Sequence, residues 1–437
     1  MNNNIQKLLF NNLSISYIAN IFTVISALVS ILLITKYAGV EIYGILSIIM
    51  ATSGILINVF SLRTSEAIVR FIRSEEAIER KVYVKLIVYI GIISDLLLGV
   101  IIVGVFYSIS DFIAEYFIKD ISYSDEVFIY SILSFLMFLG GTPAGYLKTK
   151  EMFVFINKMI ILESILKTIL LLGLFFILNS TSLFNIILVN IISLFITIII
   201  KYIVFYKEYF NEYGQEIFTF NKILFREYFN FVLKTFTSSL LKAGNHKVDT
   251  LILAFVIDVK TVGVYEIVKK IVVIPINFIS MPLSMLYYPK LVSAFKLKNI
   301  QDIRTIIFKT TFIIVSVCLF ILFIEYIVLS QVLGYLNIVF SEQYYMWLLL
   351  LFMFYVPVEW WSRIFSNSTN PVYSIYSNLT SMIYSLTVLV FFAYYFGIIG
   401  FLWALLVIKI LIFIMWAYFL RKELVLHQIY KRTEIDK

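Results

Sequence analysis

The feature that most constrains the fold is a series of long apolar runs that recurs along nearly the whole chain. A helix that spans a bilayer needs roughly 20 mostly apolar residues. Such runs lie at about 13–35, 42–62, 86–108, 127–147, 159–178, 184–205, 229–256, 263–288, 305–329, 343–365, 372–396 and 399–420. The first run is longer than a signal-peptide core, so we expect it to be retained. The sequence therefore predicts an all-α membrane protein with about twelve transmembrane helices.

Composition agrees with this prediction. Of the 437 residues, 61% are hydrophobic and 14% are charged, whereas a globular chain is about 25% charged. So few charges cannot cover a soluble surface of this size, and apolar surface must face lipid. The single cysteine, Cys318, excludes an intramolecular disulfide and a cysteine-based metal site, and two histidines are too few for a cluster. We expect no bound metal and no cofactor.

The distribution of Lys and Arg predicts the orientation. With both termini in the cytoplasm, 25 of the 35 positive residues fall in cytoplasmic segments, and three (Lys36, Lys119 and Lys260) fall outside. Cytoplasmic loops carry the excess of Lys and Arg, so this arrangement is strongly favoured. We therefore attribute the net charge of +8 to the Lys and Arg residues of the cytoplasmic segments. No basic tail or patch has the spacing of a nucleic-acid surface, and we expect no nucleic-acid partner.

The chain also contains a weak internal repeat. Gly39–Gly44, after the first run, is echoed by Asp258–Gly263 after the seventh, at an offset of 219 residues. The same offset places the loop Leu147–Phe153 on the loop Ser366–Val372. We predict two six-helix halves in parallel orientation, 1–210 and 229–437, joined by a cytoplasmic linker over 211–228. Transporters built from two such halves carry the substrate path between them.

Sequence motifs argue against an enzyme. The chain has no GxxxxGK loop, no GxSxG, no HExxH and no CxxC. No segment outside the membrane is long enough to fold as an ATPase domain. We therefore expect no catalytic residues, and work on a substrate would draw on an ion gradient, a membrane potential or the gradient of the substrate itself.

The seventh run carries the densest set of intramembrane polar residues. On a continuous helix, members three or four positions apart fall within about 80° of one face. These residues, the helix 7 polar face, are Lys234, Ser238, Lys242, Asn245 and Asp249. Charge inside a membrane is costly and usually faces a cavity or a partner, so we predict that this face lines a cavity. The simpler alternative is packing against neighbouring helices, with the lysines extending to the interface.

Other charges within the runs are weaker signals. Three acid–base pairs have i,i+4 spacing and either neutralise each other locally or line the cavity: Glu163 with Lys167, Glu266 with Lys270, and Glu359 with Arg363. Three charges stand alone and are expected to pair with another buried charge: Asp95, Glu325 and Lys409. The first run offers only hydroxyl groups to a cavity: Thr23, Ser26 and Ser30.

Short motifs in both halves resemble one family. Tyr37–Ser47 (YAGVEIYGILS) and Arg63–Phe71 (RTSEAIVRF) are similar to the start of bacterial polysaccharide and O-antigen flippases. In that family a G-x-x-x-[YF]-G turn joins helices 1 and 2, and an "-ai-R-" segment ends helix 2. Lys242–Leu253 and Val262–Tyr265 resemble its polar helix 7 and the "G-x-Y" opening of helix 8. The family belongs to the multidrug/oligosaccharidyl-lipid/polysaccharide exporter superfamily.

The resemblance implies a multi-pass flippase of the bacterial cytoplasmic membrane. Such proteins move an undecaprenyl-diphosphate-linked oligosaccharide, for O-antigen, lipopolysaccharide, capsule or a similar glycan, to the outer leaflet by alternating access. A proton or sodium gradient would drive transport, and a polysaccharide polymerase and a chain-length regulator would be partners. Expected substrate-cavity residues are Lys234, Ser238, Lys242, Asn245 and Lys270. Expected ion-coupling residues are Glu163, Asp249 and Glu359.

Three other functions compete with this one. A drug/cation antiporter of the same superfamily would carry more acidic residues and fewer lysines in its cavity. A lipid II or sporulation-type flippase typically carries extra helices. A membrane-embedded glycosyltransferase or polymerase needs a large outer loop with catalytic residues, but the longest outer loop here, near Ser110–Glu126, is short.

Overall fold

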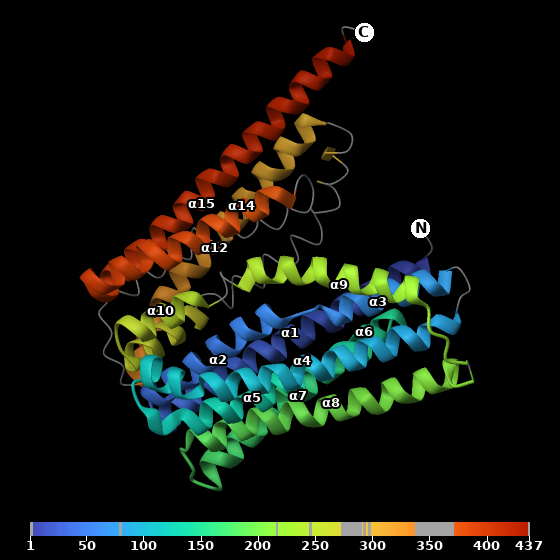
Figure 1. Ribbon diagram of the computed structural model, residues 1–437. Helices are drawn as coiled ribbons and strands as arrows, with labels where there is room; N and C mark the ends of the chain where they lie inside the picture. Colours follow the sequence, from blue (N-terminus) through green and yellow to red (C-terminus); the bar gives the residue numbers. More distant parts are fainter. Residues whose placement is uncertain are drawn as a thin grey trace. The chain divides into compact units, whose positions relative to one another are not determined.

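The computed structural model describes residues 3–77, 81–215, 217–243, 247–271, 291, 294–295, 299–336 and 371–435, and all regular structure over these residues is helical (Figure 1). The chain divides into two compact units, Met1–Lys247 and Val248–Lys437. Within the described ranges, eight helical segments are long and apolar enough to cross a membrane. They cover nine of the predicted runs, because the segment Ile375–Val425 contains two. The predicted all-α membrane fold is confirmed.

The first unit contains nine α-helices in its described part. They are α1 (Asn3–Tyr37), α2 (Val40–Phe60), α3 (Thr64–Ala77), α4 (Val84–Ile113), α5 (Ser124–Leu139), α6 (Gly141–Thr149), α7 (Phe153–Phe176), α8 (Leu183–Tyr213) and α9 (Lys222–Ala243). Two candidate spans are bent: α2 with α3 form one, and α5 with α6 lie in another. The bend before α3 passes through Arg63, which has a left-handed φ of 50°.

Close packing of α3 on α6 depends on one glycine. A Cβ atom at Gly145 would lie 2.8 Å from the carbonyl oxygen of Ser65 and 2.9 Å from the Cβ of Ile68. Neither neighbour is the flexible end of a side chain, so only glycine permits this approach. Gly145 thereby allows α3 and α6, the second segments of the two bent spans, to pack closely against each other.

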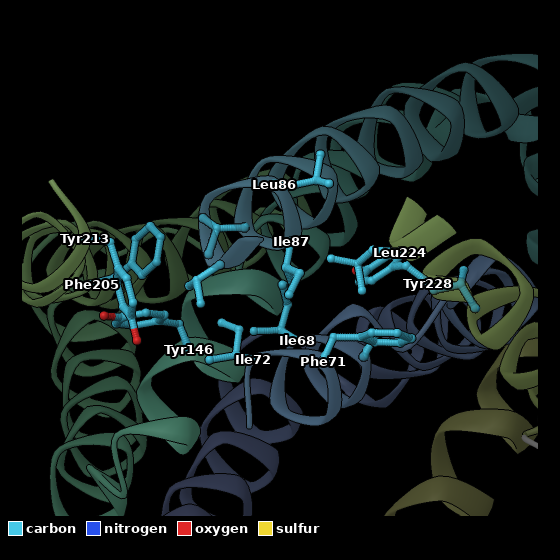
Figure 2. Packing of buried hydrophobic residues seen from close by; sticks show 14 residues of the cluster. Ile68, Phe71, Ile72, Leu86, Ile87, Tyr146, Phe205, Tyr213, Leu224 and Tyr228 are labelled. Atoms are coloured by element: carbon cyan, nitrogen blue, oxygen red, sulfur yellow. The ribbon is translucent and has the colours of Figure 1, made fainter. Parts of the chain in front are cut away.

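A buried aromatic and aliphatic cluster joins α3, α4, α6, α8 and α9 at one end of the first unit (Figure 2). Tyr146 of α6 packs edge-on against Phe205 of α8, with ring centroids 5.2 Å apart. Leu224 and Tyr228 of α9 lie in the same cluster, and the Tyr228 ring is 5.2 Å from that of Phe71. Contacts therefore group α9 with the first unit. The predicted division at 1–210, 211–228 and 229–437 stays a prediction.

The second unit is described through α10 (Val248–Val256), helical residues 259–271, α12 (Ile300–Tyr335), α14 (Pro371–Tyr384), the π-helical turn η4 (Ser385–Leu389) and α15 (Val390–Ile435). α15 bends at Gly397, where φ is 60° and ψ is −147°. This conformation is essentially restricted to glycine. The predicted boundary between the runs 372–396 and 399–420 falls at this residue. The runs 263–288 and 343–365 lie largely or wholly outside the described residues.

One helix end and the turn after it agree with the predicted repeat. The offset of 219 takes Tyr37, the last residue of α1, to Val256, the last residue of α10. It also takes Gly39, which precedes α2 with a φ of 98°, to Asp258, which precedes the helix over 259–271. The Asp258 carboxylate accepts hydrogen bonds from the amide and hydroxyl of Thr261 at 2.8 and 2.6 Å. A glycine and a capping aspartate thus occupy the same place in the two halves.

Candidate functional site

The seventh predicted helix is divided, and the prediction of one continuous helix over 229–256 is wrong. α9 ends at Ala243, and α10 begins at Val248 after Lys247, whose φ is 57°. A residue with positive φ cannot continue a right-handed helix. The equivalent positions of the first half, 25–28, lie inside the unbroken α1. Broken helices inside a membrane are tolerated where the backbone is buried in protein or lines a cavity, and in many transporters they form the substrate site.

The break separates the members of the helix 7 polar face. Lys234, Ser238 and Lys242 belong to α9, whereas Asp249 is the second residue of α10 in the other compact unit. The single face expected from uninterrupted periodicity therefore does not exist as one helical surface. The side chains of Lys234, Ser238 and Lys242 lie outside the described set. Asn245 and Glu359 lie outside the described residues altogether, so the predicted roles of these five stay predictions.

Asp249 is the centre of a polar cluster in the second unit. Its Oδ2 atom accepts hydrogen bonds from Lys269 Nζ at 2.6 Å and from the Tyr265 hydroxyl at 2.5 Å. Lys269 also lies 3.1 Å from Glu266 Oε1, which accepts a hydrogen bond from the Thr250 hydroxyl at 2.6 Å. Thr250, Glu266 and Tyr265 are buried. One ammonium group is thus shared by two carboxylates from neighbouring helices.

Lys269 was missed by the sequence prediction, which paired Glu266 with Lys270. Lys269 forms a 3.1 Å ion pair with Glu266 at i,i+3 spacing. The sequence contains a signal for contact between these two helices, namely a helical hairpin. Thr250 and Glu266 each lie eight residues from Asp258, where the chain turns. Residues equidistant from such a turn meet across antiparallel helices. Lys270 and Lys409 act electrostatically on Glu266 and Asp249, respectively, so three lysines surround two carboxylates.

Glu163 lies half-buried in α7. Two lysines act on its charge: Lys167 of the same helix, as the i,i+4 spacing predicts, and Lys201 of α8. Because α8 continues to Tyr213, Lys201 is an internal residue of a candidate span. Glu163 is therefore compensated from two helices, and its ion-coupling role stays a prediction.

Asp95 of α4 is completely buried. Its Oδ1 atom accepts a hydrogen bond from the Thr64 hydroxyl at 2.5 Å, and its Oδ2 atom accepts one from the Thr142 amide at 2.6 Å. Thr64 begins α3, and Thr142 lies in the first turn of α6. Among the described residues these donors are neutral groups at helix N-termini rather than the charged partner expected from the sequence. A carboxylate is stabilised at such termini by the helix dipole.

The hydroxyl groups of α1 bind α7 and their own helix. Ser26 donates to the carbonyl oxygen of Ser164 at 2.9 Å and accepts from Thr168 at 2.9 Å. Ser164 also lies 3.4 Å from the Thr23 hydroxyl, and Ser30 donates to the carbonyl oxygen of Ser26 at 2.6 Å. These groups hold α1 against α7. These hydroxyl groups are therefore already hydrogen-bonded within the first unit rather than available to a substrate headgroup.

Comparisons with solved structures show the fold. A multidrug resistance MATE family transporter of the MOP superfamily, in an inward-facing conformation, has a TM-score of 0.72 at 15% identity, over 92% of this chain and 95% of that one. The lipid II flippase MurJ, in an inward closed conformation, has a TM-score of 0.71 at 15% identity, over 95% and 90%. A MOP superfamily transporter from Pyrococcus furiosus scores 0.52 at 14% identity, over 93% and 96%.

Sequence comparison shows the family. No curated protein matches the chain. The family of polysaccharide biosynthesis proteins matches residues 9–295, which is more than half of the chain. This match includes all four stretches on which the resemblance to polysaccharide flippases was based, from Tyr37–Ser47 to Val262–Tyr265, and it confirms that resemblance. The chain therefore belongs to the polysaccharide biosynthesis protein family and has the membrane-transporter fold of the MOP superfamily.

Proposed function

We propose that this protein is a flippase that moves an undecaprenyl-diphosphate-linked oligosaccharide from the inner to the outer leaflet by alternating access. The observation that carries the proposal is the match to the polysaccharide biosynthesis family over residues 9–295 in a chain with a transporter fold. A lipid II flippase is among the proteins that share this fold. The product would be O-antigen, capsule, lipopolysaccharide or a similar glycan, made with a polymerase and a chain-length regulator. The protein would lie in the bacterial cytoplasmic membrane with both termini inside.

Positive charge in the second unit supports an anionic substrate. Asp249 and Glu266 are matched by Lys269 and are further surrounded by Lys270 and Lys409. A diphosphate binds most strongly to charged hydrogen-bond donors. We propose that Lys270, with Lys234, Lys242, Ser238 and Asn245 on and after α9, contacts the diphosphate and the first sugars. A drug/cation antiporter is the second candidate, favoured by the likeness to the MATE transporter.

Ion coupling is proposed for Asp249, Glu163 and Glu359. Asp249 already holds the Lys269 ammonium at 2.6 Å. A coupling proton or sodium ion that bound this carboxylate would weaken its bond to Lys269. The helix over 259–271, which carries Lys269, would then be released from α10. Ion binding would in this way change the packing of two neighbouring helices rather than only the charge of the site.

The decisive experiment deletes the gene and measures the lipid-linked sugar pool together with the surface polysaccharide. A flippase deletion leaves lipid-linked repeat units on the cytoplasmic side and removes surface glycan. Complementation with Lys270→Ala should restore little glycan, whereas Lys260→Ala, an exposed residue of the same helix, should restore it fully. Normal surface glycan with altered drug sensitivity in the deletion strain would instead establish the antiporter.

A further inference from the structure

A polar pocket lies between α3 and α9, within the first unit. It has a volume of about 380 Å³ and is lined by Arg70, Phe71, Ser74, Glu227, Asn230 and Phe231. One lining residue, Phe71, also belongs to the buried cluster of Figure 2, where it packs against Tyr228. Pockets of 300–1,000 Å³ are typical of small-ligand sites, so the volume suits a sugar unit.

Arg70 lies over aromatic rings of the pocket. Its guanidinium carbon lies 4.6 Å from the centre of the Phe231 ring and 5.9 Å from that of Phe71. A cation over a ring is attracted to it electrostatically, and this attraction uses none of the five N–H donors of the guanidinium. The two nearby arginines differ, since Arg63 is paired with Glu66 and Arg73 with Glu151. Within the described part of the chain, Arg70 forms no ion pair.

The opposite charge in the pocket is also uncommitted. Glu227 is exposed and forms no ion pair with any described residue, Arg70 included. The pocket therefore offers strong donors at Arg70, a strong acceptor at Glu227, and both kinds of group at Asn230 and Ser74. A lone anion would satisfy Arg70 but would be repelled by Glu227. A lone cation would face the reverse conflict.

We propose that this pocket binds a sugar ring of the lipid-linked oligosaccharide, an inference that rests on the proposed flippase function. Sugar hydroxyls both donate and accept, so one ring satisfies Arg70 and Glu227 together. Phe71 and Phe231 line the same pocket, and apolar lining with a few placed polar groups is typical of small-ligand sites. The recognised chemistry is thus a polyhydroxylated ring rather than the diphosphate.

The position of the pocket on α9 fits a substrate path. Asn230 lies four residues before Lys234, and Lys234, Ser238 and Lys242 follow at the same spacing along one continuous helix. Positions four apart share one face of a helix. A substrate whose sugar occupies the pocket would therefore have the proposed diphosphate-binding lysines next in line on α9. In the sequence, Arg70 stands out only as part of the family motif Arg63–Phe71.

The test measures binding to purified full-length protein in lipid nanodiscs. One probe is the lipid-linked oligosaccharide extracted from cells in which this gene is deleted, and the other is undecaprenyl diphosphate without sugar. Arg70→Ala, Glu227→Gln and Asn230→Ala should each weaken binding of the first probe by about tenfold, the loss expected for one charged or bidentate hydrogen bond. Binding of undecaprenyl diphosphate should change less than about twofold. Arg73→Ala, on the same helix but paired with Glu151, is the matched control.

The outcomes separate two failures. If the wild-type protein does not bind the oligosaccharide probe, the proposed flippase function is overturned. If the wild type binds it but Arg70→Ala and Glu227→Gln bind equally well, the pocket proposal is overturned. Equal loss of both probes would assign the pocket to the diphosphate and would also overturn the sugar proposal. Glu227→Gln preserves size on an exposed position, so a folding defect in Arg70→Ala would not leave the question open.

Discussion

At the scale of single residues, Asp95 shows how neutral donors can stabilise a buried carboxylate. Among the described residues, its hydrogen-bond partners carry no charge. It binds the first turns of α3 and α6 at once, through the Thr64 hydroxyl and the Thr142 amide. Gly141 completes the site, since a Cβ there would lie 2.5 Å from the Thr64 hydroxyl and 2.9 Å from Asp95. Asp95 therefore joins both bent spans to α4.

Asp95→Ala should lower stability by about 2 kcal/mol, because two buried donors lose their acceptor. Asp95→Asn should cost less, since the amide oxygen can accept from Thr142 while the Thr64 hydroxyl turns to accept from the amide nitrogen. Thermal unfolding in detergent measures both, with the exposed Asp125→Ala as control. Equal midpoints for Asp95→Ala and wild type would show that these bonds do not hold α3 and α6.

Lys269→Met should be more damaging than Lys270→Met. It leaves Asp249 and Glu266 without their shared ammonium, and breaking a buried pair from one side costs about 3 kcal/mol. Lys269→Met combined with Asp249→Asn should recover part of the loss because less negative charge is left uncompensated. Unfolding temperatures of the three variants give the comparison. A double variant no more stable than Lys269→Met alone would argue against charge pairing as the cause.

At the scale of helices, some boundaries could be predicted from sequence and others could not. Apolar length predicts the spans because lipid leaves the backbone no other hydrogen-bond partners. The break before α10 could not be predicted, because polar residues at spacings of three and four continue across it. Lysine also rarely adopts a positive φ, so residue type gives no sign that Lys247 does so. Lys269 and the Arg70 pocket could not be predicted either, because both depend on contacts between different helices, and residue spacing within one helix does not reveal such contacts.

Gly397→Ala tests the bend in α15. A residue with a Cβ is strained at φ 60° and ψ −147°, so we expect a loss of about 1–3 kcal/mol. Gly104→Ala is the control, because a Cβ there meets nothing within 4 Å inside α4, and it should be neutral or slightly stabilising. Similar unfolding temperatures for the two variants would mean that α15 straightens at this point without cost.

At the scale of the whole molecule, the orientation predicted from Lys and Arg can be tested with cysteines. Cys318 is the single native cysteine and is buried, so Cys318→Ser provides the background. In intact cells, Lys119→Cys should react with a membrane-impermeant thiol reagent, whereas Lys222→Cys should react only after permeabilisation. The reverse pattern would invert the topology and place the proposed sugar pocket on the wrong side for its substrate.

The matching ends of α1 and α10 bear on how such a chain changes over generations. Tyr37 and Val256 are related by the offset of 219, and so are Gly39 and Asp258 in the turns that follow, although α1 is unbroken and its counterpart is divided. The residues at equivalent positions mostly differ, but the spacing from helix end to turn is the same. An inserted residue advances everything beyond it by about 100° and 1.5 Å, and in a membrane no loop can absorb that shift. Divergence in these halves is therefore expected as replacement within a segment of constant length, with gains and losses of residues confined to stretches such as 214–221.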